Sequence, residues 1–456
     1  MSDAPIPPSP AGQPVTGVVE DVMTPEGREQ IYSDYVEGNL RRNYIAHFTH
    51  GMLGMTGFRL IFAPTFVPAY LHMLTGSPIF VGLGQALIQL GAIASPVMGA
   101  AHIEHRRRVM PAAMTIGILM RLQLLGLAVA GWFLTGSVLI TATFLFLLFF
   151  GFFLGSQRVA FQVLLSKVIP IRMRGRLQAW RNIAGGAIAA ALSWWAGVHL
   201  IETNALGNGY ATTFMVAFVL TSLGLGALWL FLREPESPTV KVQMGVMARV
   251  REFPQLLVDR DYRNFLIAQM LATAGRIVIP FCIIYAGRKL EVDGAMIGLL
   301  SLAFLGADTI TNLLWGTLGD RYGFRLTFIL TVATWALSLF GMIFAQETWH
   351  FLLAFFGLGA AASGYMMSST TLVLEFGNRD DIPMRLALST TVETSMATIG
   401  PVVGGVVASM AGLLPVFVIS LISLVASLLV LVSAVREPRH LKAASHDAVQ
   451  RRNRQL

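Results

Sequence analysis

The sequence predicts an all-α integral membrane protein with twelve transmembrane helices in two six-helix bundles. Hydrophobic residues make up 55% of the 456 residues and charged residues only 13%, and the mean hydropathy is +0.64. A typical soluble domain has about 25% charged residues. Apolar runs also recur along the whole chain. Each is near the roughly 20 residues that a helical span needs, and long continuous runs favour helices over a barrel of short alternating strands.

The apolar runs fall into two groups of six, separated by one long polar stretch. The first six lie at 44–73, 79–103, 109–134, 138–166, 180–202 and 210–232. The second six lie at 264–287, 294–318, 326–346, 350–376, 386–410 and 413–435. The expected divisions of the chain are an N-terminal tail 1–42, a first bundle 43–233, a central loop 234–263, a second bundle 264–436 and a C-terminal tail 437–456.

The N-terminal tail differs from the bundles in composition. Residues 1–26 are polar and rich in proline, which predicts disorder. Residues 27–42 place Ile31 and Tyr35 at helical spacing, which favours a short helix lying on the inner membrane surface. No basic segment followed by an apolar one opens the chain, so we expect no cleaved signal peptide.

Basic residues indicate the orientation in the membrane. Most of the 33 Lys and Arg residues fall in the two tails and in every second loop, whereas the loops 75–78 and 135–137 hold none. The positive-inside rule therefore places both termini in the cytoplasm, and we expect the cell inner (plasma) membrane. This asymmetry accounts for the net charge of +8 without a nucleic-acid partner.

The two halves of the sequence resemble each other. T-G-F-R at 56–59 corresponds to T-A-G-R at 273–276, and both span six and span twelve end in R-E-P. An even number of spans gives both halves the same orientation in the membrane. The sequence therefore predicts a parallel repeat, with a pseudo-twofold axis along the membrane normal.

A compact charged turn, G-T-L-G-D-R-Y-G-F-R at 316–325, joins spans eight and nine. With twelve helices, a central loop and both ends inside, this turn resembles the signature of the major facilitator superfamily. The resemblance covers about residues 42–436 and implies a secondary transporter. The first-half counterpart, G-A-A-H-I-E-H-R-R-R at 99–108, is degenerate, with Glu104 near the usual aspartate. No motif selects a subfamily.

The resemblance implies that Asp320 in this turn contacts the start of span eleven. A helix N-terminus attracts a carboxylate, and Arg385 would add a positive partner. Gly323 suits a turn with positive φ. We expect this contact to hold the cytoplasmic side shut, although an ordinary solvated turn is the alternative. The expected gating residues are Gly316, Gly319, Asp320, Arg321, Gly323, Arg325 and Arg385.

Two arginines lie about halfway through spans one and seven. Arg59 and Arg276 occupy equivalent positions in the repeat, so a parallel pseudo-twofold axis would place them across one central cavity. Guanidinium groups suit a carboxylate or phosphate on a solute. The alternative is structural, with each arginine paired to a nearby acid or to helix carbonyls. The candidate substrate-binding residues are Arg59, Arg276, Gln85, Gln89, Arg121 and Gln157.

Two acids lie within spans, Asp308 in span eight and Glu393 in span eleven. Burial disfavours a charged carboxyl group, so both are candidates for carrying a proton during transport. Asp308 is the stronger candidate because it lies deeper. The alternative is a permanent ion pair, for example with Arg276.

These observations predict a secondary active transporter that moves a small organic solute, anionic or amphiphilic, by alternating access with proton coupling. The alternative substrate is a hydrophobic drug-like compound exported by proton antiport. A receptor or assembly factor on the same fold is an alternative of another class. An enzyme is not expected, because no catalytic cluster marks either membrane face. We expect no cofactor, no metal, and a monomer whose partners are its solute, protons and lipid.

Overall fold

The computed structural model describes residues 25–103, 106–236, 253–376 and 382–437. In the first half the helices are α2 (Pro25–Gly38), α3 (Leu40–Phe62), α4 (Phe66–Thr75), α5 (Pro78–Ile103), α6 (Met110–Phe133), α7 (Gly136–Val168), α8 (Ile171–Ala196) and α9 (Gly209–Phe231). A π-helical turn, η1 (Gly197–Ile201), and a 3₁₀ turn, η2 (Ala205–Gly207), follow α8. The expected disordered segment 1–26 lies almost wholly outside the described residues.

The second half repeats this arrangement. Its elements are α11 (Phe253–Leu256), α12 (Arg260–Ala274), the 3₁₀ segment η3 (Gly275–Phe281), α13 (Cys282–Gly287), α14 (Gly294–Tyr322), α15 (Phe324–Phe344), α16 (Thr348–Glu375), α17 (Ile382–Ala411) and α18 (Leu413–Ala434). Eleven spans in the described residues are long and apolar enough to cross a membrane, and Pro78–Ile93 of α5 is a shorter apolar helix. The predicted all-helical membrane fold is confirmed.

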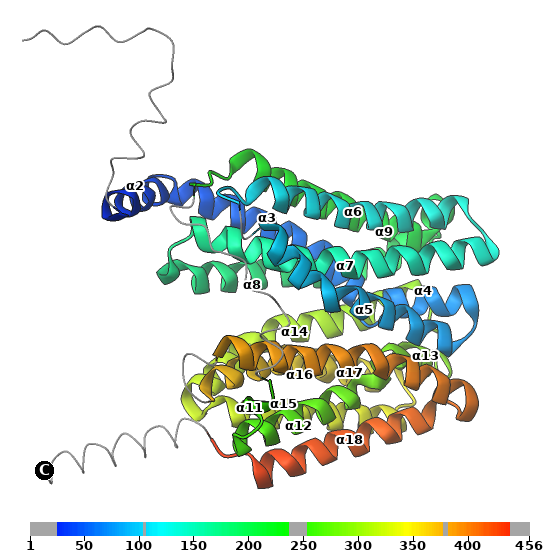
Figure 1. The fold of residues 1–456 in the computed structure, drawn as a ribbon. Coiled ribbons are helices and arrows are strands. Elements are labelled where there is room, and N and C mark those ends of the chain that lie inside the picture. The colour runs from blue at the N-terminus through cyan, green and yellow to red at the C-terminus, as the bar shows by residue number, and fades with distance from the viewer. Residues whose placement is uncertain (1–24, 104–105, 237–252, 377–381, 438–456) are drawn as a thin grey trace, which may run out of the picture.

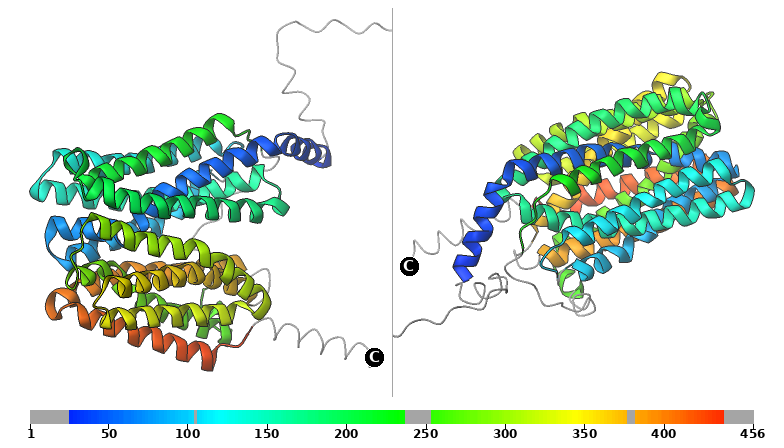
Figure 2. Two further views of the ribbon diagram at one scale, coloured as in Figure 1. Left: turned by 180° about the vertical axis from the view of Figure 1, so that it is seen from behind. Right: turned by 90° about the horizontal axis from the view of Figure 1, so that it is seen from above.

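The two halves form two bundles that lie side by side (Figures 1 and 2). We call the end of the molecule at which α3 begins and α18 ends the tail side, and the end at which α4 ends and α5 begins the far side. Helix α2 projects from the tail side of the first bundle (Figure 2). It is tied there by a hydrogen bond of 2.8 Å from the Tyr32 hydroxyl to the Lys167 carbonyl. Its place on a membrane surface stays a prediction.

Spans one and seven are broken at equivalent places, although each reads as one continuous apolar run in the sequence. The first span breaks after α3, where Ala63 has an extended backbone (φ −55°, ψ 136°), and resumes as α4. The seventh tightens into η3, which contains Pro280. Arg59 lies in the last turn of α3, and Arg276 is the second residue of η3. A short 3₁₀ piece inside a helix often marks a hinge.

The R-E-P segment after span six forms a tail-side corner that joins four helices of the first half. The Asn43 side chain of α3 bonds both backbone groups of Arg233, at 2.8 and 3.0 Å. The Glu234 carboxylate accepts hydrogen bonds from the backbone N–H of Val109, at 2.6 Å, and of Met110, and it pairs with Lys167 of α7. A carboxylate satisfies the free N–H groups and the dipole at the start of α6.

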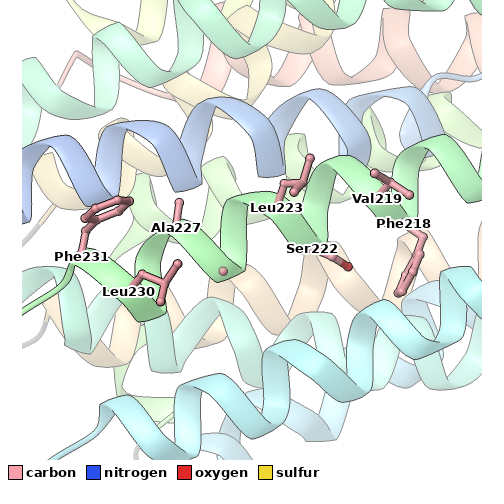
Figure 3. Close-up of a pocket in the computed structure, with 8 residues that line it drawn as sticks. Phe218, Val219, Ser222, Leu223, Ala227, Leu230 and Phe231 are labelled. Atoms are coloured by element: carbon pink, nitrogen blue, oxygen red, sulfur yellow. The ribbon is translucent and has the colours of Figure 1, made fainter.

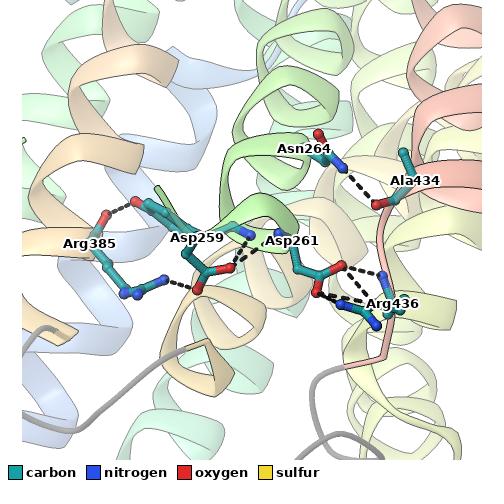
Figure 4. A network of polar contacts seen from close by, with 7 residues as sticks. Asp259, Asp261, Asn264, Arg385, Ala434 and Arg436 are labelled. Carbon is teal, nitrogen blue, oxygen red and sulfur yellow. Dashed lines mark hydrogen bonds and ion pairs between the residues drawn. The ribbon is translucent and has the colours of Figure 1, made fainter. Parts of the chain in front are cut away.

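The R-E-P segment after span twelve forms the matching corner in the second half. Arg436 pairs with Asp261 of α12 at 2.8 Å, and Asn264 donates to the Ala434 carbonyl (Figure 4). The Glu437 carboxylate lies against Gly323, within 2.6 Å of the point where a Cβ would stand. Gly323 has φ +94°, which confirms the predicted turn with positive φ. The two corners support the internal repeat read from the sequence.

The halves pack closely through small residues on the far side. A Cβ added to Gly82 of α5 would stand 2.0 Å from the Pro401 carbonyl of α17. A Cβ added to Gly197 would stand 2.4 Å from the Gly294 carbonyl and 2.6 Å from the Gly298 Cα. Glycines at such contacts let helix backbones approach one another, as in other membrane helix pairs.

Candidate functional site

An ion pair joins the two halves near the middle of the bundle. Arg59, held by the last turn of α3, places Nη1 2.8 Å from Oδ2 of Asp308 on α14. The same nitrogen donates to the Thr309 hydroxyl at 3.0 Å. Both charged side chains are about one-fifth exposed. A charged pair at this depth must be held by partners or reached by water, so it is a functional candidate.

The equivalent arginine of the second half is paired within its own bundle. Arg276 Nη1 lies 3.2 Å from Oε1 of Glu393 on α17. Its guanidinium carbon lies 5.1 Å from the centre of the Trp335 ring and 5.0 Å from that of Tyr365, so two aromatic faces share its charge. Gln269 of α12 donates to the other Glu393 oxygen at 3.4 Å.

These pairs bear on the readings that the sequence left open for the charges. Each predicted arginine has an acidic partner in this conformation, as the structural alternative expected. The ion pair expected with Arg276 forms at Glu393, whereas Asp308 binds Arg59. Solute binding by either arginine stays a prediction, and an anion there would have to compete with a carboxylate.

The other predicted solute ligands lie in the first half. Arg121 is buried between helices, where Nε donates to the Thr221 carbonyl at 2.7 Å and Nη1 to the Gly117 carbonyl at 2.8 Å. Gln157 lies 3.5 Å from Arg121 and is also buried. Gln85 and Gln89 are half-buried on α5, the helix that packs against α17 of the other half. The hydrogen bonds given for Arg121 and Gln157 do not include Arg59 or Asp308, although the Arg121 guanidinium carbon lies 5.7 Å from the centre of the Phe58 ring.

Six of the predicted gating residues lie at the end of α14 and the start of α15, and Arg385 lies on α17. Arg325 donates to the Leu431 carbonyl at the end of α18 at 2.9 Å. Arg385, expected to assist Asp320, donates to Asp259 at 2.8 Å (Figure 4) and covers the Tyr262 ring. Asp259 caps the start of α12. Segment 377–381 lies outside the described residues, so the contact of Asp320 with span eleven stays a prediction.

Further hydrogen bonds between the halves lie on the far side. The carboxylate of Glu202, after η1, accepts from the backbone N–H of Gly294 at 2.7 Å, at the start of α14. The hydroxyls of Thr65 and Ser301 bond each other in the buried interface. Sequence reasoning missed both contacts, because each joins residues that no motif connects.

An apolar groove of about 490 Å³ on α9 is not part of this site (Figure 3). Its lining comes from that helix alone, and Leu223, Leu230 and Phe231 are all exposed. In a membrane-spanning bundle such a surface meets lipid tails. Among the residues that the structure describes, no cluster of three or more His, Cys, Asp or Glu has the arrangement of a metal site.

The comparisons with known proteins agree with this architecture. The family model of the Major Facilitator Superfamily matches residues 265–454. The chain is 25% identical over 395 residues to the multidrug resistance protein MdtG of Salmonella typhimurium, covering 83% of this chain and 92% of that protein. It is 31% identical over 147 residues to the multi-drug resistance efflux pump PmrA homolog of Lactococcus lactis subsp. lactis, covering 31% of this chain and 36% of that protein.

Solved structures share the fold at low sequence identity. The nucleoside transporter NupG superposes with a TM-score of 0.62 at 13% identity, covering 86% of this chain and 98% of that one. The D-xylose–proton symporter superposes with a TM-score of 0.67 at 15% identity, covering 88% and 99%. Two bundles of apolar helices are also the architecture of these two solved transporters. The second half of the chain thus resembles the Major Facilitator Superfamily in sequence, and the whole chain resembles membrane transporters in fold.

Proposed function

We propose that this protein exports an amphiphilic organic solute across the inner membrane in exchange for protons. The observation that carries the proposal is the ion pair between Arg59 and Asp308, because it joins the two moving halves through a group that can take up a proton. The expected type of transport is alternating access, with both termini in the cytoplasm and the chain acting as a monomer.

The coupling follows from the charge state of Asp308. While ionised, its carboxylate accepts a charge-assisted hydrogen bond from Arg59, worth about 1.5–3 kcal/mol. A proton on Asp308 removes the negative charge and weakens this bond, so the halves can separate at the centre. Release of the proton on the other side restores the pair. One proton carried per cycle by Asp308 is the expected stoichiometry.

The contacts between the halves support alternating access. Those described lie in the middle and on the far side, where Gly197 packs on α14 and Glu202 binds its first turn. We infer that the far side is closed in this conformation and that these contacts break when it opens. Opening and closing around a central site at the interface of two repeats is the transport mode expected of such proteins.

The nature of the solute follows from the balance of charge at the centre. Arg59 and Arg276 are each matched by one carboxylate, so the centre carries no excess positive charge from these two residues. An amphiphilic compound can bind beside such pairs without displacing either carboxylate. The names of the two multidrug relatives favour the same solute class, whereas NupG and the xylose symporter share only the fold. A small organic anion that displaces Glu393 from Arg276 is the second candidate.

Uptake into proteoliposomes tests this function, with ethidium as the amphiphilic probe and with and without an imposed pH gradient. Wild type should move ethidium faster with the gradient, and Asp308→Asn should lose that response. Asp293→Asn is the matched control, since it lies at the cap of the same helix and asparagine caps equally well. If wild type moves ethidium at the same rate without the gradient, proton coupling is wrong. If it moves no solute from a wider panel, the receptor alternative replaces transport.

The sidedness of the termini needs a separate test. In a Cys282→Ser background, a single cysteine at the exposed Ser137 should react with an impermeant maleimide applied to whole cells. A cysteine at the exposed Arg176 should react only after the cells are opened. Labelling in the opposite order would reverse the orientation that the positive-inside rule gives.

A further inference from the structure

A second group of polar side chains is buried inside the first half, apart from the central ion pair. Arg121 is 2% exposed, His47 1% and His50 5%. Arg181 of α8 is partly buried beside them. The proton coupling proposed above uses none of the three most buried residues, so it does not explain why these polar side chains are buried.

These residues meet where α3, α6, α7 and α8 pack together. A Cβ at Gly51 would stand 1.6 Å from Nε of Arg181, so this arginine lies directly on α3 next to His50. The His50 ring stacks on Phe161 of α7 at 4.7 Å. Gln157, the partner of Arg121, lies one turn away from Phe161 on the same helix. Helix α9 links the two sides of the group: its Thr221 carbonyl accepts from Arg121, and a Cβ at its Gly224 would stand 3.1 Å from the His50 carbonyl.

The polar atoms of this cluster are largely without partners. His47 Nε2, both ring nitrogens of His50, Arg121 Nη2 and Arg181 Nε are buried and make no hydrogen bond. The bonds that Arg121 does make go to two carbonyls and one amide. Within the described residues, neither arginine pairs with a carboxylate. A buried cation without a counter-charge is strongly unfavourable, so the cluster is built to receive a negative group.

We propose that His47, His50, Arg121 and Arg181 form an anion site that binds a small oxyanion group such as a carboxylate, sulfonate, sulfate or phosphate. Guanidinium groups are donors only, and each neutral imidazole can donate one N–H, so the donor set matches an oxyanion. Arg181 is the least buried of the four residues. The group could be a free inorganic anion or the head of an organic solute, and both present the same oxygens.

Sulfate binding to the purified full-length protein tests the site, measured by equilibrium dialysis with labelled sulfate. Wild type should bind sulfate saturably. Arg181→Gln and Arg121→Gln should each weaken it about tenfold or more, the effect of losing one charge-assisted hydrogen bond. Arg158→Gln is the matched control, because this arginine of α7 is exposed. If Arg121→Gln fails to fold, the less buried Arg181 still provides the test.

Competition separates the two sources of the anion. If benzenesulfonate displaces sulfate and uncharged benzenesulfonamide does not, the site accepts the anionic head of an organic solute. If only inorganic anions compete, it holds a free ion. Both outcomes support the site, and neither depends on transport of ethidium.

Either of two results would overturn the proposal. One is the absence of saturable sulfate binding in wild type, and the other is binding that is unchanged in Arg181→Gln.

Discussion

The two halves place an arginine at the same point of the repeat but pair it differently. Arg59 binds Asp308 across the interface, whereas Arg276 binds Glu393 inside its own bundle and rests on two aromatic rings. Arg59 lies just before the break in its span, and Arg276 lies within the 3₁₀ segment of the equivalent span. The internal repeat places an arginine at the equivalent position of each half, but the carboxylate that pairs with it determines what the arginine can do. A pair across the interface responds to motion between the halves, and a pair within one half moves with it.

The largest expected difference is in coupling. Asp308→Asn should reduce gradient-driven solute movement about tenfold or more, because Arg59 loses its ionised partner and the proton carrier is gone. Glu393→Gln should keep most of the response to the gradient. Proteoliposome flux at two imposed gradients measures both variants. If both variants lost the response to the gradient equally, the two ion pairs would act together, and the proposed difference between the halves would be wrong.

The next effect concerns closure of the far side. Gly197→Leu should prevent the approach of η1 to α14, since even a Cβ meets backbone atoms at 2.4 and 2.6 Å. Transport should fall severalfold while a cysteine near Ser301 becomes more reactive from the far side. Gly226→Leu is the control, because a Cβ there meets nothing within 4 Å. Normal flux in Gly197→Leu would show that this contact does not form during the cycle.

A smaller effect is expected on stability. Glu393→Gln should lower the stability of the second half by about 1–2 kcal/mol, because Arg276 keeps its two aromatic neighbours and both charges are about one-quarter exposed. Thermal unfolding in detergent measures this as a drop of a few degrees. A loss of about 3–5 kcal/mol, as expected when one partner of a fully buried ion pair is removed, would mean that Trp335 and Tyr365 do little to stabilise the charge of Arg276.

The smallest effect concerns Glu202. Replacing it with glutamine keeps a hydrogen-bond acceptor but removes the charge at the start of α14, worth about 0.5–1 kcal/mol. The far-side-open population should rise about two- to fivefold. The rate of maleimide labelling of a far-side cysteine measures this population. Glu291→Gln is the control, because it changes a charge in the loop before α14. Equal labelling of the two variants would show that Glu202 does not help to close the far side.

The number and order of the spans could be predicted from apolar runs, because the bilayer requires them. The breaks after Arg59 and at Arg276 were not predicted, because the long apolar runs continue on both sides of them; Pro64 and Pro280 are the sequence signals that could have marked them. The pairing of Asp308 with Arg59 depends on how the two halves meet, and the repeat alone made both arginines equivalent. The pairing of Arg385 with Asp259 could not be predicted either, because it depends on how the start of α12 packs against α17.

The two R-E-P corners have a consequence for the ancestry of the chain. Each corner closes on residues of its own half, with Asn43 and Glu234 in one and Asp261 and Arg436 in the other. In the part of the chain that the structure describes, the corner contacts given above stay within one half. Such self-contained corners are what duplication of a single six-helix unit would produce, and the unequal arginine pairs mark where the two units now differ.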